Sequence, residues 1–221
     1  MSAVTTSFIH GFEPGRDVAA PPLLVLHGTG GNENDLLPLA NEIAPGATVL
    51  SPRGKVLEAG MPRFFRRLAE GVFDQADLAL RTEELAEWVR AAAIEYGIDQ
   101  SRLIAVGFSN GANIAASLLL RYPKELAGAI LIRAMVPFVP ENAARVLTGK
   151  RVLLLSGRQD PIVPAAQPQE LAQILRSAGA DVELTWQPGG HGLTNGDLTA
   201  AVRWIASLHT RQPAVPVSAR K

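Results

Sequence analysis

The feature that most constrains this chain is a pentapeptide, Gly107-Phe108-Ser109-Asn110-Gly111, that lies between two apolar segments. Residues 103–106 form a short apolar run typical of a buried strand, and residues 112–120 have the composition of a helix. When a strand turns sharply into a helix across G-x-S-x-G, the serine side chain stands at the apex of the turn. The glycines leave room for neighbouring backbone there. The motif therefore predicts that Ser109 is a nucleophile at a helix N-terminus, where free N–H groups favour negative charge.

Segments that resemble strands and helices alternate along the rest of the chain. This alternation predicts a mostly parallel sheet with helices on both faces, an α/β fold. Buried strands are expected at 23–26, 47–50, 103–106, 127–132, 152–155 and 182–186, with a weaker edge strand in 5–13. Helices are expected at 35–43, 74–96, 168–178 and 195–208. The 168–178 helix has Pro168 in its first turn, and Thr194 with Asp197 can cap the 195–208 helix.

Length and the absence of a linker favour one domain. The chain has 221 residues, too few for two ordinary α/β domains. We therefore expect a single domain over residues 1–221, with its core in about 20–208 and a frayed tail at 210–221.

Charge and composition narrow the classes of partner. Basic and acidic side chains both number 21, so there is no net field to attract nucleic acid or an acidic membrane. No apolar run has the length of a membrane span, and the first residues lack the order of a signal peptide. The chain has no cysteine, which excludes disulfides and a thiol nucleophile. We expect a cytoplasmic protein that binds neither nucleic acid nor membrane; the sequence leaves a homodimer open.

Two further residues complete a candidate catalytic set with Ser109. Asp160 and His191 each follow a predicted strand, and reactive side chains gather at the carboxyl ends of parallel strands. His191 is the predicted base, because an imidazole takes and returns protons near neutral pH. Asp160 is predicted to orient the imidazole and not to accept its proton. His27 heads a glycine-rich loop, and we expect it to brace that loop.

A serine nucleophile also needs preorganised donors for the oxyanion that forms on the attacked carbonyl. The predicted donors are the backbone N–H groups of Asn110, which follows the nucleophile, and of Thr29, which follows the 23–26 strand. The loop around Thr29 lacks both the G-K-[ST] ending and the G-x-G-x-x-G pattern of nucleotide sites. No His/Asp/Glu grouping has metal-ligand spacing. We therefore expect neither a cofactor nor a metal.

Residues 55–73 show no clear periodicity and are predicted to be irregular. They contain Phe64 and Phe65 beside several arginines. Because the net charge is zero, we favour a loop that packs its aromatic rings and leaves its arginines solvated over one that binds nucleic acid. We expect Phe64 and Phe65 to line or cover the acyl pocket.

Four stretches carry a resemblance to a known family. They are HGTGGNENDL at 27–36, GMPRFF at 60–65, GFSNGAN at 107–113 and MVP at 135–137. Over about residues 20–208 the sequence resembles the phospholipase/carboxylesterase family of small bacterial α/β-hydrolases, and especially the hydrolases associated with hydroquinone resistance. One departure is Ile132-Arg133-Ala134, where close relatives carry histidines and proline; it affects the pocket wall near Arg133.

The resemblance implies an α/β-hydrolase fold without a large cap domain and a Ser-Asp-His esterase. Ser109, Asp160 and His191 fall on the family's triad positions, and Thr29 and Asn110 fall on its oxyanion positions. With Phe64 and Phe65, Met135 is expected to bind substrate. The sequence thus predicts a serine carboxylesterase that hydrolyses small soluble esters through an acyl-enzyme. A thioesterase or lysophospholipase with the same triad, and a non-catalytic binding protein of this fold, remain alternatives.

Overall fold

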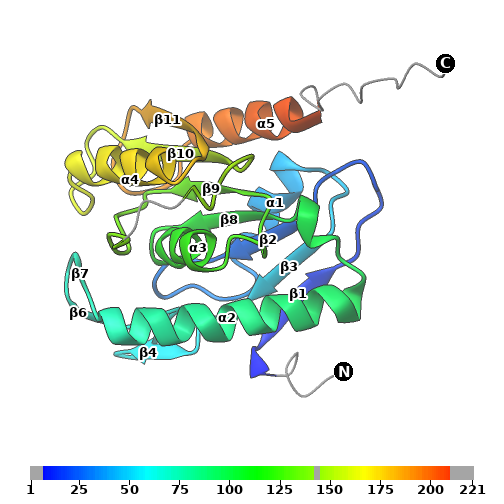
Figure 1. Cartoon of the computed structure of the whole chain (residues 1–221), viewed down its shortest axis with the longest axis horizontal. Helices are drawn as coiled ribbons and strands as arrows, with labels where there is room; N and C mark the ends of the chain where they lie inside the picture. Colours follow the sequence, from blue (N-terminus) through cyan, green and yellow to red (C-terminus); the bar gives the residue numbers. More distant parts are fainter. Residues whose placement is uncertain (1–6, 142–144, 210–221) are drawn as a thin grey trace.

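The computed structural model describes residues 7–141 and 145–209. Its centre is a seven-stranded sheet in the order β1-β3-β2-β8-β9-β10-β11 (Figure 1). The strands are β1 His10–Glu13, β2 Leu23–Leu26, β3 Val49–Pro52, β8 Ile104–Phe108, β9 Gly128–Ile132, β10 Arg151–Gly157 and β11 Asp181–Gln187. Only β1 runs antiparallel to its neighbour, β3; the other strand pairs are parallel.

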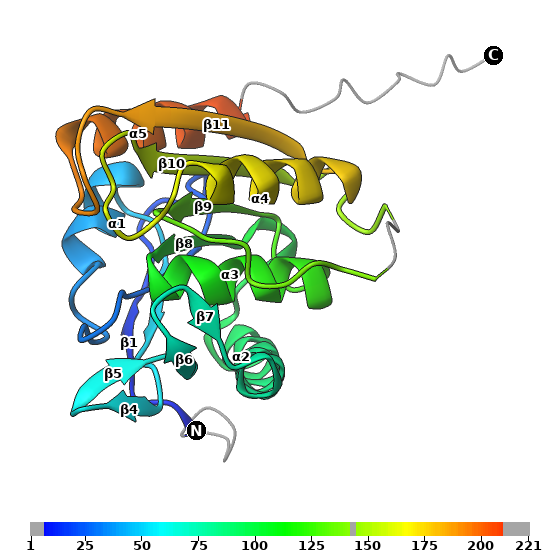
Figure 2. The same cartoon turned by 90° about the vertical axis from the view of Figure 1, so that its left-hand side faces the viewer.

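Helices cover both faces of this sheet, as the alternation predicts (Figures 1 and 2). They are α1 Leu37–Ile43, α2 Gln75–Tyr96, α3 Asn110–Arg121, α4 Ala166–Ser177 and α5 Asn195–His209, with a 3₁₀ turn at Gln100–Arg102. Helices α2, α3 and α4 pack on one face, where they share a core with alternate strand residues such as Leu24 and Leu154. Helices α1 and α5 pack on the other face against the intervening residues, such as Val25 and Leu155.

The long helix α2 shows why its boundaries could be predicted. The Asp74 carboxylate accepts a hydrogen bond from the N–H of Asp77 at the start, and Gly97 adopts a left-handed conformation at the end. Leu78, Leu85, Val89 and Ala92, which fall on the predicted inner face, are fully buried. At α5, the predicted cap is also present: Thr194 and Asp197 exchange hydrogen bonds between their side chains and backbone N–H groups.

The prediction of an irregular segment at 55–73 was wrong. The segment forms two antiparallel hairpins, β4 Val56–Glu58 with β5 Met61–Arg63, and β6 Arg67–Ala69 with β7 Val72–Phe73. Their strands are too short for a period of two to become visible in the sequence. The first turn, Ala59-Gly60, has positive φ at both residues, as a two-residue hairpin turn requires, but it lacks the usual Asn-Gly signature.

Both chain ends bear on remaining predictions. Strand β1 lies within the predicted 5–13 segment, whereas residues 1–6 and the predicted frayed tail at 210–221 lie outside the described residues.

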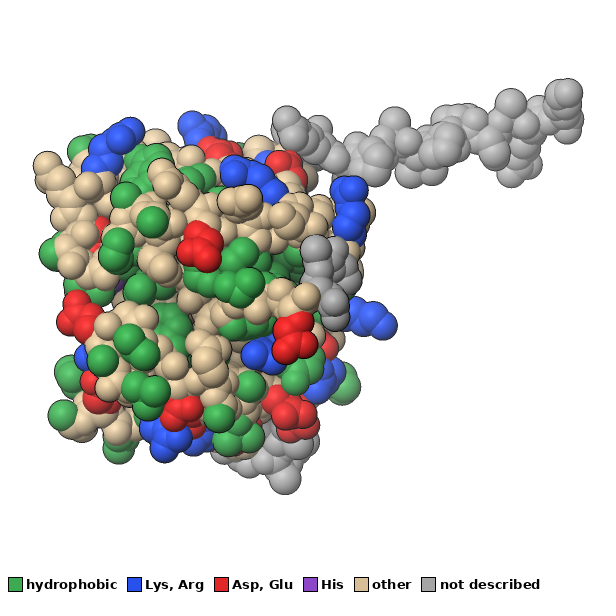
Figure 3. Space-filling model, turned by 60° about the vertical axis from the view of Figure 1, so that its left-hand side comes forward, with side chains coloured by type: hydrophobic (Ala, Val, Ile, Leu, Met, Phe, Trp, Pro, Cys, Tyr) green, Lys and Arg blue, Asp and Glu red, His purple; other side chains and the backbone are tan. Residues whose placement is uncertain are grey.

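Within 7–141 and 145–209, no helix has both the length and the apolar composition that spanning a membrane would need. The expectation of a single domain stays a prediction. On the face drawn in Figure 3, basic and acidic side chains are interspersed, without a large patch of one sign.

Candidate active site

The turn between β8 and α3 places Ser109 in a strained backbone conformation, with φ of 52° and ψ of −113°. Positive φ in a residue other than glycine is uncommon and is often found at functional sites. The turn is held on both sides: Ser109 N–H donates to the Ile132 carbonyl at 2.8 Å, and the Ser109 carbonyl accepts from Asn113 N–H at 3.0 Å.

The two glycines of the motif are required by close backbone contacts. A Cβ on Gly107 would lie 2.6 Å from the Ala112 Cα, and one on Gly111 would lie 2.0 Å from the Leu26 carbonyl oxygen. Both separations are far below van der Waals contact, so a larger residue would push α3 away from β8 or β2. The prediction that these glycines make room for neighbouring backbone is confirmed.

Three side chains from the ends of three strands meet at this turn. The Nε2 atom of His191 lies 2.9 Å from Ser109 Oγ, and its Nδ1 atom lies 2.9 Å from Asp160 Oδ2. If Nδ1 donates its proton to Asp160, then Nε2 is free to accept the Ser109 proton. The Asp160 side chain is 1% exposed, and its other oxygen accepts from the N–H groups of Ile162 and Val163. The carboxylate is therefore fixed in position before substrate arrives.

A buried arginine holds the loop that carries His191. Arg133 Nε donates to the Gly190 carbonyl at 3.0 Å, and Nη2 donates to the Gly192 carbonyl at 2.9 Å. The guanidinium is therefore bonded to the backbone on both sides of His191. Its charge is balanced by Asp197, with two hydrogen bonds of 2.7 and 2.9 Å. Sequence reasoning left the role of Arg133 undefined and assigned Asp197 to the α5 cap alone. The pairing carries no local signal, because the two residues lie far apart in the sequence.

The loop after β2 places Thr29 opposite the start of α3. His27 braces this loop as expected: its Nδ1 atom contacts the Gly28 carbonyl at 2.6 Å, and its Nε2 atom accepts from Gly54 N–H at 3.0 Å. Burial lowers the pKa of His27, which favours the neutral ring that can accept this bond. Neither Thr29 N–H nor Asn110 N–H donates to another residue of the described chain. Both N–H groups thus remain available to a ligand.

The loop and the start of α3 are joined through the hairpin segment. The Asn110 side-chain oxygen accepts from Phe64 N–H at 2.7 Å, and the Thr29 hydroxyl accepts from Arg63 Nη1 at 2.7 Å. The candidate oxyanion donors are therefore each held by a bond to β5 or the residue after it.

A cavity of about 350 Å³ opens beside Ser109. Its lining combines the candidate site residues with side chains of the second hairpin and of the segment after β9: Thr29, Arg63, Arg67, Glu70, Gly71, Phe73, Phe108, Ser109, Asn110, Asn113, Met135, Ile162 and His191. A larger cavity of about 590 Å³, lined by Arg102 and Arg151 among others, lies near the amino ends of the strands and contains none of the candidate site residues. We therefore place the site at the smaller cavity.

Two expectations about the pocket need correction. Phe64 and Phe65 are 2% and 0% exposed and do not belong to the lining of the cavity. The Phe65 ring packs edge-on against Phe73, which does line the cavity. Complete burial of a large apolar ring is more favourable than its partial exposure to water in a cavity. Arg63, expected to be solvated, is only 3% exposed. Met135 lines the cavity, and its binding of substrate stays a prediction.

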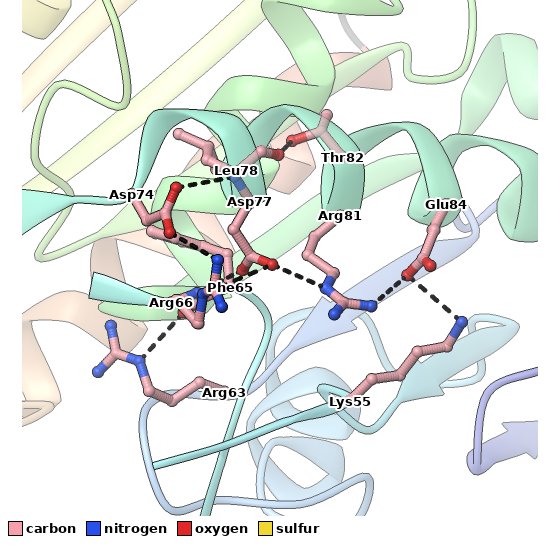
Figure 4. A network of polar contacts seen from close by, with 10 residues as sticks. All are labelled: Lys55, Arg63, Phe65, Arg66, Asp74, Asp77, Leu78, Arg81, Thr82 and Glu84. Carbon is pink, nitrogen blue, oxygen red and sulfur yellow. Dashed lines mark hydrogen bonds and ion pairs between the residues drawn. The ribbon is translucent and has the colours of Figure 1, made fainter. Parts of the chain in front are cut away.

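A network of ion pairs fixes the segment between the two hairpins against the start of α2 (Figure 4). Arg66 N–H donates to Asp77 at 2.7 Å, and the Arg66 guanidinium donates to Asp74 at 2.8 Å. Arg81 then connects Asp77 with Glu84. The bond from the Arg66 backbone N–H to Asp77 anchors the segment from which Arg63 and Arg67 reach the cavity. No group of side chains suited to holding a metal occurs among the described residues.

Comparisons with known proteins agree with this architecture. A family model described as phospholipase/carboxylesterase matches residues 12–209. MhqD of Bacillus subtilis (strain 168), which is named as a hydrolase, is 49% identical over 186 residues, covering 82% of this chain and 90% of MhqD. The crystal structure of a Bacillus cereus carboxylesterase superposes with a TM-score of 0.88 at 50% identity, covering 90% and 94% of the two chains. A structure of YahD with malic acid gives 0.85 at 33% identity, covering 90% and 98%.

Proposed function

Because this chain belongs to the phospholipase/carboxylesterase family of hydrolases, we propose that it is a serine carboxylesterase acting through an acyl-enzyme on Ser109. The observation that carries the proposal is the pair of 2.9 Å contacts that join Ser109, His191 and Asp160. The predicted α/β-hydrolase fold, with a mostly parallel sheet, helices on both faces and no large cap among the described residues, is confirmed.

Acylation follows from the geometry of the three side chains. His191 Nε2 takes the proton from Ser109 Oγ as the oxygen attacks the ester carbonyl carbon. The negative charge that forms on the carbonyl oxygen is received by the N–H groups of Thr29 and Asn110. The tetrahedral intermediate collapses, the bond to the alcohol oxygen breaks, and His191 returns its proton to the departing alcohol.

Deacylation repeats the sequence with water. His191 takes a proton from a water molecule while the water oxygen attacks the acyl carbon. It then returns the proton to Ser109 Oγ as the acid leaves. Throughout, Asp160 holds the imidazole in the tautomer that leaves Nε2 free and stabilises the imidazolium that forms. The bonds from Ile162 and Val163 keep Asp160 in place during both steps.

The size of the cavity favours small substrates. A space of about 350 Å³ holds a short acyl or alcohol group and not a long lipid chain. A thioesterase or a lysophospholipase would use the same three side chains, and the distinction between them rests on the leaving group. A binding protein of this fold would keep the contacts but lack turnover.

Labelling and turnover together test the proposal. A fluorophosphonate probe should add one adduct at Ser109, and the protein should turn over 4-nitrophenyl acetate. Ser109→Ala should abolish both, whereas Ser101→Ala, which changes an exposed serine of the Gln100–Arg102 turn, should change neither. Labelling at another serine, or equal turnover by Ser109→Ala, would contradict the assignment. Probe labelling without any ester or thioester turnover would favour the binding protein.

A further inference from the structure

Two arginines line the same cavity as the candidate nucleophile. Arg63, at the end of β5, is 3% exposed, and Arg67, at the start of β6, keeps 29% of its side chain exposed. An arginine is seldom buried without a partner, because removing a guanidinium from water costs several kcal/mol. The partners of these two side chains therefore show whether the charge in the cavity is balanced.

A single carboxylate serves both guanidinium groups. Glu58 lies 3.1 Å from Arg63 Nε through one oxygen and 2.9 Å from Arg67 Nη2 through the other. The other acceptors of Arg63, the Thr29 hydroxyl and the Phe65 carbonyl, are neutral. Glu70 also lines the cavity, but it is exposed, where water and salt screen its charge. Two cations against one close anion leave one positive charge at this wall of the cavity.

The hydrogen bonds of the two arginines show which of their donor groups lack an acceptor. Arg63 Nη2 and Arg67 Nη1 donate to no acceptor in the described parts of the chain. Burial lowers the pKa of the Arg63 guanidinium, and the attraction of Glu58 offsets this effect only in part. An anion in the cavity would supply both the missing acceptor and the missing charge. The planar fork of a guanidinium matches a carboxylate in particular.

We propose that Arg63 and Arg67 form a carboxylate subsite, and that the substrate is a small ester that carries a carboxylate, such as a half-ester of a dicarboxylic acid. This inference rests on the proposed esterase function and specifies its substrate class. The carboxylate binds the free N–H groups of the two arginines while the ester carbonyl lies at Ser109. Because Arg63 also holds the Thr29 hydroxyl, the subsite adjoins the candidate oxyanion donors.

Two matched substrate pairs test the subsite from either side of the ester bond. On the acyl side, 4-nitrophenyl hydrogen glutarate is compared with 4-nitrophenyl valerate, which has the same chain length and leaving group without the charge. On the alcohol side, 3-acetoxybenzoate is compared with 3-acetoxybenzamide. We expect kcat/KM to favour the carboxylate by about tenfold or more in at least one pair. No preference in either pair would overturn the proposal.

Two neighbouring arginines give a variant and its control. For the pair in which the carboxylate is preferred, we compare kcat/KM of the charged substrate with kcat/KM of the neutral one. Arg67→Gln should lower this ratio to about one, because the substitution removes a donor and leaves Glu58 to balance Arg63. Arg66→Gln removes the same charge from the adjacent residue, which is 62% exposed and pairs with Asp74, so its ratio should match that of the unchanged protein. An equal loss in both variants would show a general effect of charge and overturn the subsite. A stronger preference for 3-acetoxyphenyl phosphate than for 3-acetoxybenzoate would identify a phosphate site and overturn the carboxylate assignment.

Binding to Ser109→Ala separates the subsite from turnover. Calorimetry should detect glutarate but not glutaramide, and Arg67→Gln in the same background should weaken the glutarate affinity about tenfold. If no ester is hydrolysed but this pattern appears, the esterase function fails while the subsite stands. If the neutral esters are hydrolysed in a Ser109-dependent way and glutarate does not bind, the subsite fails while the esterase function stands.

Discussion

Two almost fully buried arginines contact different loops of the candidate active site, and they differ in how their charges are balanced. Arg133, on the side of His191, has its own buried carboxylate, since the side chains of Arg133 and Asp197 are 0% and 1% exposed. Arg63, on the side of the candidate oxyanion donors, shares with Arg67 a carboxylate that is 35% exposed.

The difference separates a structural cation from one that is available to a ligand. Arg133 directs its donors to Asp197 and to the carbonyl groups of Leu155, Gly190 and Gly192, which are all parts of the fold. Arg63 lines the cavity, and its Nη2 group donates to no acceptor among residues 7–141 and 145–209. Burial alone therefore does not define the role of an arginine. The role follows from whether the protein supplies all of its acceptors.

The largest expected effect comes from changing Asp160, the carboxylate that contacts His191. This change tests whether Asp160 is needed to orient the His191 ring, or whether the bonds from Arg133 to the His191 loop are enough. Asp160→Asn should lower kcat for 4-nitrophenyl acetate on the order of 10⁴-fold, as the same change does in a trypsin-type protease, because the amide can hold the wrong imidazole tautomer. The melting temperature, measured by circular dichroism, controls for unfolding. A near-normal rate would show that another group orients His191 and that the Arg133 grip on its loop suffices.

A smaller effect compares the two arginines directly through the free energy of unfolding in urea. Arg133→Met leaves the buried Asp197 unpaired and should cost about 3–5 kcal/mol. Asp197→Asn in that background should restore part of the loss, because it removes the unpaired charge. Arg63→Met should cost less than about 2 kcal/mol, because Glu58 is partly exposed and retains Arg67. Equal costs for the two methionine variants would remove the distinction between the arginines.

The same two arginines mark the boundary of what the sequence could predict. The strand–turn–helix around Ser109, the parallel sheet and the ends of α2 follow from apolar periodicity, glycine and capping residues, which are local signals. Arg133 and Asp197 are charged residues in distant parts of the chain, and Arg63 belongs to a strand of three residues. Nothing local indicates that such side chains are buried. The meeting of Ser109, Asp160 and His191 was predictable because parallel strands bring their carboxyl ends to one edge.

Misplacing Phe64 and Phe65 had the same origin. Their position in the sequence correctly indicated a segment near the candidate site, but it did not indicate which side chains of that segment face the cavity. The two rings are buried, whereas Arg63 and Arg67 reach the lining. Phe64 and Phe65 lie between β5 and β6, outside any strand, so no periodic pattern in the sequence indicates which way their side chains point.

The smallest expected effect is a pH dependence that distinguishes the two sides of Ser109. On the Arg63 side, burial lowers the pKa of His27, so the folded state favours the neutral ring. The unfolded chain therefore binds more protons at His27 once the pH falls below its unfolded value of about 6.5, and stability is lost from there toward the folded value. The slope contributed by this one group is at most about 1.4 kcal/mol per pH unit.

Urea unfolding between pH 7.5 and 5.0 measures this contribution, with His27→Gln as the comparison. Carboxylates such as Glu33 and Glu58, whose pKa values are lowered chiefly by hydrogen bonds from Arg53 and Arg67, lose their contribution only at lower pH, below about 4.5. The glutamine cannot titrate, but it can still accept from Gly54 N–H, so His27→Gln should lose less stability across the interval than the unchanged protein. Parallel stability curves would show that His27 does not set a pH dependence on the Arg63 side.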